Sequence, residues 1–328
     1  MIGRIGRGAW TTVRTFRDAV LAVLVAALIC ALIGQVLRDS VAILSPLMYI
    51  PPIPLVSAAL LVDALRRGRT LRGPRFSLAL LALLVMGIHA PSAIGLRSLD
   101  ATDPATPSLR LLQWNVRWGG SWDEPYDWPE IGTRILSEQP DLIVLSEAPS
   151  NDGCVELLTD TLGPQWQVAS QTTHSFALGY LSRMRLICRF PVSVEYTRQI
   201  PTGAATVVRI ETDPPMRLMM CDGISGPGDK SHLLRFFADL IERDGTIDIV
   251  AGDFNALGQS RGFSRFRSAG FREASAHDFT LRSTWPAGYP TFSIDHVFVR
   301  TPHRLVGVHT FDGPSDHRGQ VVDFQLMR

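Results

Sequence analysis

The spacing of apolar and polar residues divides the chain into two parts. Residues 1 to about 96 carry long apolar runs, whereas residues 109–328 alternate short apolar runs with polar turns. Three stretches of the first part, at residues 19–37, about 41–65 and 76 to about 95, each supply the roughly 20 apolar residues that a bilayer core requires. The pattern therefore predicts a membrane region with about three transmembrane segments, followed by a soluble domain.

Two features qualify these apolar stretches. The second contains PPIP at residues 51–54, and because proline interrupts helices, a re-entrant or two-piece segment is the alternative to a straight span. The first is similar to a secretory signal, but two more apolar stretches follow it and no convincing small-residue cleavage site is present. It is therefore interpreted as a retained helix.

Arginine placement predicts the orientation of the membrane region. One set of flanks carries only Arg38 and Arg97, whereas the other carries Arg4, Arg7, Arg14, Arg17, Arg66, Arg67, Arg69, Arg72 and Arg75. Loops rich in arginine stay in the cytoplasm, so three crossings put everything after Arg97 outside. The predicted location is the cell membrane, as a multi-pass protein with an extracytoplasmic domain; the alternative is that these arginines only solvate a linker.

The rest of the chain predicts a tether and one domain. Residues 97–108 are polar with two prolines, which is typical of an extended linker. Helical spacing of apolar residues predicts helices at residues 128–139 and 231–244. Short apolar runs predict strands at residues 108–116, 140–147, 177–183, 186–198, 204–212, 216–223, 246–255, 293–300 and 319–326. This mixture over residues 109–328 predicts an α/β sandwich.

Charge and cysteine content narrow the function. Residues 109–328 contain 21 Arg and Lys against 26 Asp and Glu, a net charge of −5, with no basic stripe. This argues against a protein that holds long nucleic acid by its backbone and favours a compact substrate. Cys30 lies in the first apolar stretch, and Cys154, Cys188 and Cys221 match no metal-binding spacing. All four are interpreted as buried apolar residues, and a Cys188–Cys221 disulfide stays open.

Polar side chains recur where the predicted strands end. They are Asn115 in QWNVR, Glu147 in LSEAPS, Asp253 and Asn255 in GDFN, Asp295 in SIDHVF, and Asp316 with His317 in GPSDHRG. Any one of them alone is explained as a turn former or a helix cap. Together they suit a Mg²⁺-dependent phosphoryl hydrolase, because Mg²⁺ prefers oxygen ligands and neutralises charge on phosphate. A histidine oriented by a carboxylate then takes a proton from water or stabilises the transition state.

The motifs QWNVR, LSE, GDFN, IDHVFV and SDHRG, in this order, resemble those of the endonuclease/exonuclease/phosphatase superfamily. That superfamily includes deoxyribonucleases, abasic-site endonucleases, sphingomyelinases and inositol-polyphosphate phosphatases. LSRMRL and STWP also resemble its segments, and the resemblance covers nearly all of residues 109–328. It implies a four-layer α/β/β/α sandwich of the deoxyribonuclease-I-like kind and a bound Mg²⁺, with Mn²⁺ as an alternative.

The resemblance also implies a metal site. Glu147 would be the principal Mg²⁺ ligand, and Asp316 would be a second carboxylate of the metal site. Asn115 would help to position the metal shell and the phosphate.

The remaining motif residues would act on the phosphate ester. Asp253 would orient or deprotonate the attacking water, and Asn255 would donate to a phosphate oxygen. His317 would be the catalytic histidine, held by Asp295. Which of these groups is the base stays open.

Three positions qualify the resemblance. His296 must point away from Asp295 if its strand is regular, which favours a structural role. Trp285 in STWP lines the substrate cleft or packs in a loop. The family usually has a histidine in a THL-like segment before GDFN, whereas this chain has Asp222 and Gly223 there.

Two classes of function follow. The favoured one is a membrane-embedded, metal-dependent phosphoesterase that hydrolyses a lipid head group, a small molecule or a nucleic acid by attack of water. Its acidic domain and apolar segments favour the first two substrates over DNA or RNA. The alternative is a catalytically impaired binding domain of the same fold, and no protein partner is identifiable from the sequence.

Overall fold

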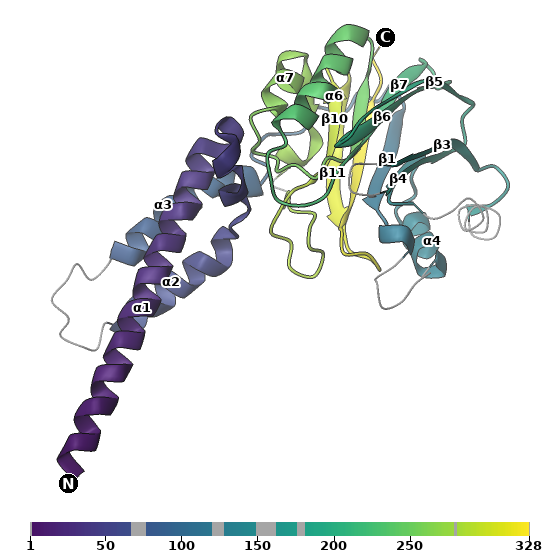
Figure 1. The fold of residues 1–328 in the computed structure, drawn as a ribbon. Coiled ribbons are helices and arrows are strands. Elements are labelled where there is room, and N and C mark those ends of the chain that lie inside the picture. The colour runs from purple at the N-terminus through teal and green to yellow at the C-terminus, as the bar shows by residue number, and fades with distance from the viewer. Residues whose placement is uncertain are drawn as a thin grey trace. The chain divides into compact units, whose positions relative to one another are not determined.

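The computed structural model of the chain describes residues 2–66, 77–119, 128–148, 162–175, 181–278 and 281–327. The chain forms two compact units, Met1–Ala90 and Pro91–Arg328 (Figure 1). Each unit has an apolar core of its own. The arginine-rich loop at residues 67–76 and Cys154 lie outside the described residues.

The first unit is helical. Its elements are α1 (Ile2–Leu37), the short 3₁₀ helices η1 (Arg38–Ser40) and η2 (Ala42–Tyr49), α2 (Pro52–Arg66) and α3 (Ser77–Ala93). Among the described residues, Asp18–Ser40 alone is a helix long and apolar enough to cross a membrane. η2 and α2 meet that requirement only as one broken span, and the apolar helix Leu78–Ala90 is shorter. The structure thus supports one such segment, or two with the broken pair, where the sequence predicted about three.

The break between η2 and α2 follows from the proline sequence. The two helices are bent by 65° relative to each other. Pro51 cannot continue a helix, and Pro52 is accommodated as the first residue of α2, where its missing N–H costs nothing. The prediction that PPIP interrupts this segment is confirmed.

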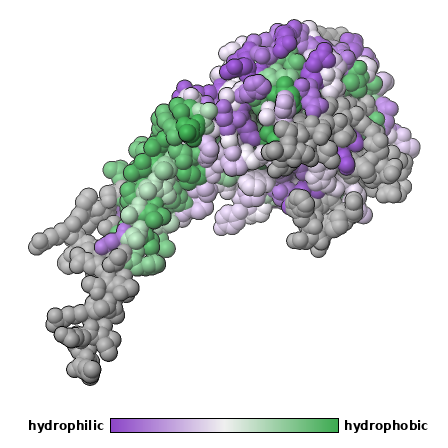
Figure 2. Space-filling model, in the orientation of Figure 1, coloured by the Kyte–Doolittle hydropathy of each residue, from purple (hydrophilic) through white to green (hydrophobic). Residues whose placement is uncertain are grey.

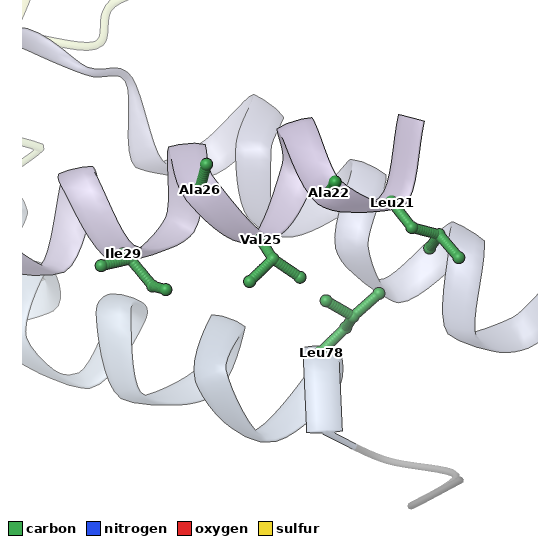
Figure 3. Close-up of a pocket in the computed structure, with 6 residues that line it drawn as sticks. All are labelled: Leu21, Ala22, Val25, Ala26, Ile29 and Leu78. Carbon is green, nitrogen blue, oxygen red and sulfur yellow. The ribbon is translucent and has the colours of Figure 1, made fainter. Parts of the chain in front are cut away.

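Apolar side chains form the interior of the first unit. They also dominate the coloured surface of this unit on the face that Figure 2 shows. Leu28, Ala31, Ala59 and Val85 are fully buried between its helices. A groove of about 430 Å³ between α1 and α3 is lined by Leu21, Ala22, Val25, Ala26, Ile29 and Leu78 (Figure 3). These side chains are all aliphatic, so the groove offers no group that could perform chemistry.

Two six-stranded mixed sheets form the second unit. Their strand orders are β11-β12-β1-β2-β4-β3 and β5-β6-β7-β8-β10-β9. Only the pairs β1/β2 and β7/β8 are parallel. The strands of the first sheet are β1 (Ser108–Asn115), β2 (Leu142–Ser146), β3 (Gln167–Ser175), β4 (Leu181–Cys188), β11 (Arg304–Phe311) and β12 (Gly319–Gln325). Those of the second are β5 (Val192–Ile200), β6 (Gly203–Ile210), β7 (Met216–Gly223), β8 (Ile249–Asp253), β9 (Phe271–Glu273) and β10 (Asp295–Arg300).

Helices cover the outer faces of both sheets (Figure 1). α4 (Trp128–Ser137) belongs to the apolar cluster on the first sheet. α6 (Ser231–Asp244) and α7 (Phe263–Ser268) belong to the cluster on the second. A third apolar cluster fills the space between the sheets, with members from both, such as Val144 and Ala251. The order helix, sheet, sheet, helix confirms the predicted four-layer α/β/β/α sandwich.

The segment at residues 97–108 lies along the second unit. The N–H of Asp100 donates to the backbone oxygen of Leu305 at 2.8 Å, and the Asp100 carboxylate pairs with Arg272 at 2.7 Å. The N–H of Asp103 donates to Gln325 Oε1 at 2.9 Å. Where the sequence predicted an extended tether, this segment is therefore bound to the domain.

The two described cysteines of the second unit are free thiols. Cys188 faces the core between the sheets, whereas Cys221 faces the outer cluster beneath α6. The second sheet therefore separates them, and the disulfide left open by the sequence does not form. Burial raises the pKa of both thiols, which fits the predicted role as apolar residues.

Candidate active site

The alternation of side chains along the strands places a row of carboxylates between the two sheets. Residues two positions apart on a strand face the same way, and in the second sheet the apolar core positions Met220, Ala251 and Val297 are each two residues from an aspartate. The register pairs Asp222 with Asp253 and Asp253 with Asp295. One row of three aspartates therefore crosses β7, β8 and β10 at one end of the core.

The first sheet supplies amides and a hydroxyl to this row. Gln113 Nε2 donates to Asp295 Oδ1 at 3.3 Å, and Gln320 Nε2 donates to the Asp295 backbone oxygen at 2.6 Å. The N–H of Asp253 donates to Ser146 Oγ at 3.3 Å. Both sheets therefore contribute to the site, which is fixed by the packing of the whole sandwich.

Asp253 is held by two asparagines. Asn115 Nδ2 donates to it at 2.9 Å, and Asn255 donates through its Nδ2 at 3.0 Å and its backbone N–H at 2.8 Å. Burial and the neighbouring Asp295 raise the pKa of Asp253 to about 7, although His317 and these donors favour the charged form. Asp253 is thus a fixed carboxyl group that exchanges its proton near neutral pH.

Asn255 uses its amide to connect two strand ends. Its Nδ2 also donates to the backbone oxygen of Gly223 at 2.8 Å, so β7 and β8 are joined where both end. The backbone of Asn255 is left-handed, with φ of 47°, a conformation that asparagine tolerates better than most residues. The resemblance implies that Asn255 donates a hydrogen bond to a phosphate oxygen. That oxygen would compete for the amide N–H with Asp253 or with the Gly223 carbonyl.

His317 and Asp295 form a buried pair. Their Nδ1 and Oδ2 atoms are 2.8 Å apart, Asp295 is 0% exposed and His317 is 6% exposed. Burial alone would lower the pKa of His317, but Asp295, with Asp253 and Asp316, raises it to about 10. Burial would raise the pKa of Asp295, but the neighbouring His317 lowers it below the usual value for aspartate. At neutral pH the pair is therefore an imidazolium that donates from Nδ1 to a carboxylate.

The loop that carries His317 is fixed to the end of β1. The indole of Trp114 donates to the backbone oxygen of His317 at 2.9 Å. Ser315 Oγ donates to the backbone oxygen of Asn115 at 2.7 Å and accepts from the N–H of His317 at 3.2 Å. The histidine is thus held by its backbone as well as by Asp295.

Glu147 stands at the end of β2 beside other charged groups. Burial raises the pKa of its carboxyl group; His317 and Asn115 oppose that shift, while Asp316 and Asp295 add to it. Its backbone has φ of 46°, a conformation that is strained for glutamate and persists only where the surroundings impose it. The strand end therefore turns a carboxylate towards other carboxylates, which favours a cation nearby.

Asp316 has one oxygen in use and one without a partner. Its Oδ2 accepts from Trp285 Nε1 at 3.3 Å and lies 3.6 Å from Arg117 Nη1. Its Oδ1 is buried and has no hydrogen-bond partner among the described residues. An unpaired buried carboxylate oxygen is costly, and a metal ion would satisfy it.

Three other side chains of the site lie close enough together to hold a metal ion. Within the described ranges, Asp253, Asp295 and His317 are the one set of at least three acidic, histidine or cysteine side chains whose ligand atoms lie within 4.8 Å of one another. Hydrogen bonding argues against an ion among them, because Nδ1 of His317 is a donor and Asp253 already accepts from Asn115 and Asn255. This set is better suited to proton transfer than to ligation.

His296 faces away from this site, as strand alternation predicts. Its Nδ1 lies 2.9 Å from Glu273 Oε1, and its Nε2 lies 2.8 Å from the backbone oxygen of Ala256. Aromatic rings, including Phe254 and Phe263, pack around it. The structure thus gives His296 a packing and hydrogen-bonding role.

The motifs contain several further site residues, but none of these residues was itself assigned a role. Gln113 and Arg117 belong to QWNVR, Ser315 belongs to SDHRG, and Thr284, whose Oγ1 accepts from the N–H of Asp295 at 3.3 Å, belongs to STWP. Gln320 lies inside a predicted strand and outside the motifs. A polar residue at an inward-facing strand position would have been a signal for the two glutamines, but only the observed register shows which positions face inward. Trp285, by contrast, was singled out by STWP, and it contacts Asp316 and stacks on Phe292 with ring centroids 6.1 Å apart.

Comparisons with known proteins agree with this architecture. A model of the Endonuclease/Exonuclease/phosphatase family matches residues 112–317. The fold is similar to that of an endonuclease/exonuclease/phosphatase from Beutenbergia cavernae, with 19% identity and a TM-score of 0.53 over 67% of this chain and 72% of that chain. A sequence comparison with curated proteins gave no match.

Two further solved structures share the fold. A mannosyl-6-phosphatase from Bacteroides thetaiotaomicron has 12% identity and a TM-score of 0.51 over 66% of this chain and 100% of that chain. TDP2 of D. rerio, complexed with a single-strand DNA product, has 15% identity and a TM-score of 0.50 over 67% of this chain and 99% of that chain. Since the family model spans more than half of the chain, from before Asn115 to His317, the chain belongs to the endonuclease/exonuclease/phosphatase family.

Proposed function

We propose that this protein is a membrane-anchored, Mg²⁺-dependent phosphoesterase that hydrolyses a phosphodiester or phosphomonoester by attack of water. The observation that carries the proposal is the buried set of Asp253, Asp295 and His317 beside the carboxylates Glu147 and Asp316. Family membership supports the reaction class, because the similar structures include a phosphatase and a protein with a DNA product.

His317 acts in this proposal as a cation and proton donor. Asp295 keeps the imidazole protonated at neutral pH, so His317 is poorly suited to take a proton from water. Its Nδ1 is occupied by Asp295, and no described residue accepts a hydrogen bond from its Nε2. That N–H is therefore available to stabilise the charge that develops on the phosphate.

Asp253 is the better candidate for the base. A pKa of about 7 leaves a substantial anionic fraction at neutral pH and a strong enough base to accept a proton from water. Asn115 and Asn255 fix the orientation of the carboxylate. The two roles thus fall on neighbouring groups whose pKa values lie far apart.

The residues present fit a hard divalent cation. Glu147 and Asp316 offer carboxylate oxygens, one of them buried without a partner among the described residues. Asn115 adds an amide oxygen, which accepts from the N–H of Arg117 at 2.9 Å and keeps a second lone pair. Bound Mg²⁺ would neutralise charge on the phosphate. Mn²⁺, which also accepts oxygen ligands, is the alternative ion.

Two observations guide the choice of substrate. The net charge of −5 over residues 109–328 disfavours long nucleic acid, and the apolar helix Asp18–Ser40 favours a location at a membrane. A lipid head group or a small phosphate ester is therefore the first candidate. A nuclease activity is the second, and the DNA product bound to the similar TDP2 structure favours it.

The test is hydrolysis by the full chain in detergent micelles, with a phosphomonoester, a phosphodiester, single-stranded DNA and phospholipids, each with Mg²⁺ and with a chelator. We expect metal-dependent hydrolysis of at least one ester, and its loss in Glu147→Gln, because an amide is a much poorer Mg²⁺ ligand than a carboxylate. The matched control is Glu242→Gln, an exposed position on α6. A folded wild-type protein that hydrolyses none of them, or a Glu147→Gln variant as active as wild type, contradicts the proposal.

The membrane part of the proposal has a separate test. The apolar pattern predicts about three crossings, and with three crossings the arginine distribution predicts an extracytoplasmic carboxyl terminus. A reporter fused after residue 328 should therefore be active only outside the cytoplasm. Reporter activity confined to the cytoplasm would show that the predicted orientation is wrong and would leave the proposed reaction unaffected.

A further inference from the structure

Lys230 is the one lysine among the 32 basic residues of the chain. It lies in the connection between β7 and α6 and is only 6% exposed. Its Nζ donates to the backbone oxygen of Ile224 at 2.5 Å. A buried lysine usually has a carboxylate partner in contact, because burial of an unpaired ammonium is unfavourable. Lys230 therefore needs an explanation.

The hydrogen bonding of Lys230 is incomplete. An ammonium has three N–H groups, and one acceptor, the neutral carbonyl of Ile224, is present among the described residues. Burial lowers the pKa of Lys230 to about 8, while the charge of Asp253 opposes that shift. Lys230 is thus protonated at neutral pH, with two donors left for another group.

The position of Lys230 links it to the candidate active site. The carbonyl that it binds, Ile224, directly follows Gly223, whose carbonyl accepts from Asn255 Nδ2 at 2.8 Å. Consecutive Cα atoms lie about 3.8 Å apart, so Lys230 and Asn255 are anchored to neighbouring peptide groups. Both also act on the charge of Asp253.

The candidate active site carries more negative than positive charge, which the Lys230 ammonium would partly offset. The carboxylates Asp222, Asp253 and Asp295 form one row, and the cation His317 is already paired with Asp295. A phosphate ester that entered beside this row would bring further negative charge. A compact ammonium at the β7 end of the row, opposite the His317 end, would offset it.

We propose that Lys230 is an anion-binding residue of the active site, whose ammonium binds a non-bridging oxygen of the substrate's phosphate on the β7 side of Asp253. The inference rests on the proposed function for its substrate, but the anion site itself is testable without turnover. It also gives the site a cation bound at the end of β7, the strand where the sequence departs from the family pattern.

The experiment measures binding of inorganic phosphate to the full chain with Mg²⁺ by calorimetry. Lys230→Gln should weaken binding about tenfold, since hydrogen bonds to charged groups contribute about that much, and Lys230→Arg should recover part of the loss. Arg243→Gln, which removes the same charge from an exposed position on α6, is the matched control and should bind like wild type. Binding by Lys230→Gln within twofold of wild type, or no phosphate binding by wild type, overturns the proposal.

Kinetics separate this role from a structural one. If the wild-type protein hydrolyses an ester, Lys230→Gln should raise KM about tenfold with kcat changed less than threefold, because a ground-state contact is lost. A lower unfolding temperature with unchanged KM would mean that Lys230 only ties Ile224 to α6. Lys230-dependent phosphate binding without hydrolysis of any ester would contradict the proposed function and leave the anion site standing.

A measurement on the unmodified protein covers the case in which the variants do not fold. Because Lys230 is the single lysine, an amine-specific acylating reagent can modify only this side chain and the α-amino terminus. Inorganic phosphate should slow acylation of Lys230 and leave that of the terminus unchanged, read out by peptide mass spectrometry. Equal acylation rates with and without phosphate would overturn the proposal.

Discussion

Two neighbouring residues of β10 take part in two histidine–carboxylate pairs of opposite character. Asp295 pairs with His317 at 2.8 Å on the face towards the other sheet. His296 pairs with Glu273 at 2.9 Å on the face towards the outer helices. Both pairs are buried and similar in length, so neither burial nor distance distinguishes a reactive pair from a structural one.

The two pairs differ in what remains unbound. The ring of His296 is bound on both nitrogens, to the Glu273 carboxylate and to the Ala256 carbonyl, and both partners are acceptors. Glu273 is further paired with Arg282. In contrast, His317 uses only Nδ1 for its partner, and no described residue accepts from its Nε2.

This difference separates the energetic roles of the two pairs. A buried pair with all donors satisfied holds the surrounding structure in one arrangement, and removing one partner leaves a buried charge uncompensated. A pair with one unused donor can hold a ligand at that donor. The unused hydrogen bond, more than the ion pair, is therefore what indicates a functional histidine in this fold.

The largest expected effect is the loss of turnover when His317 is replaced. His317→Ala should lower kcat by about 10³-fold, within the range that a positioned proton donor contributes, because the cation at the phosphate is lost. The unfolding temperature should also fall, because the buried Asp295 carboxylate loses its partner, so kcat is taken from the folded fraction. Steady-state kinetics on the ester identified above, with thermal unfolding of the same samples, measures both, and a kcat within tenfold of wild type would place catalysis elsewhere.

The second-largest expected effect is a loss of stability when the Glu273–His296 pair is broken. Glu273→Gln should destabilise the fold by about 3 kcal/mol, because His296 and Arg282 would lose the charge that compensates them. The kcat of the folded fraction should stay within about threefold of wild type, as expected for a group outside the site. Urea unfolding gives the stability, and an unchanged midpoint would show that this cluster is not what holds the outer face of β10.

The sequence predicted the elements whose burial pattern is regular. α6 was predicted at residues 231–244 and lies there, because Leu233, Leu234, Phe237, Ala238 and Ile241 recur at helical spacing and are buried. β3 was missed because QVASQTTHS is mostly polar and forms the edge of its sheet. β11 was missed because Gly307 interrupts its pattern at a bulge.

The candidate site was predictable only as far as local motifs extend. GDFN and SDH singled out Asp253 and His317, since strand ends with acidic residues are conspicuous in one dimension. Gln113, Gln320 and Lys230 are also near those groups, yet they are brought there by sheet register and by a loop. Their contributions depend on which strands are neighbours, and that information is not local in the sequence.

The third effect is on the pH dependence of stability. The Glu273–His296 pair should matter on the acid side of the pH range and the Asp295–His317 pair on the alkaline side. Burial would raise the pKa of Glu273, but Arg282 and His296 lower it, so its stabilisation is present above the unfolded value near 4.5 and is lost as the pH falls. The pKa of His317 is raised to about 10 from 6.5, so its stabilisation is complete below pH 6.5 and is lost as the pH rises through 10.

The unfolding temperature from about pH 2 to about pH 11 tests this contrast. Glu273→Gln should lose less stability than wild type on the acid side, and His317→Gln should lose less on the alkaline side. If both variants followed the wild-type curve, neither pair would set the pH limits of the fold.

The smallest expected effect is the extra loss in a double variant. Asp295→Asn should slow turnover by about a hundredfold, because the asparagine no longer keeps His317 protonated and oriented. Once His317 is replaced by alanine, Asp295 has no imidazole to act on, so the double variant should be less than about threefold slower than His317→Ala alone. The same cycle with Glu273→Gln in place of Asp295→Asn should instead give independent effects, because that pair lies on the other face of β10. Losses that multiply in the first cycle would mean that Asp295 acts without His317, and the contrast between the two pairs would then rest on position alone.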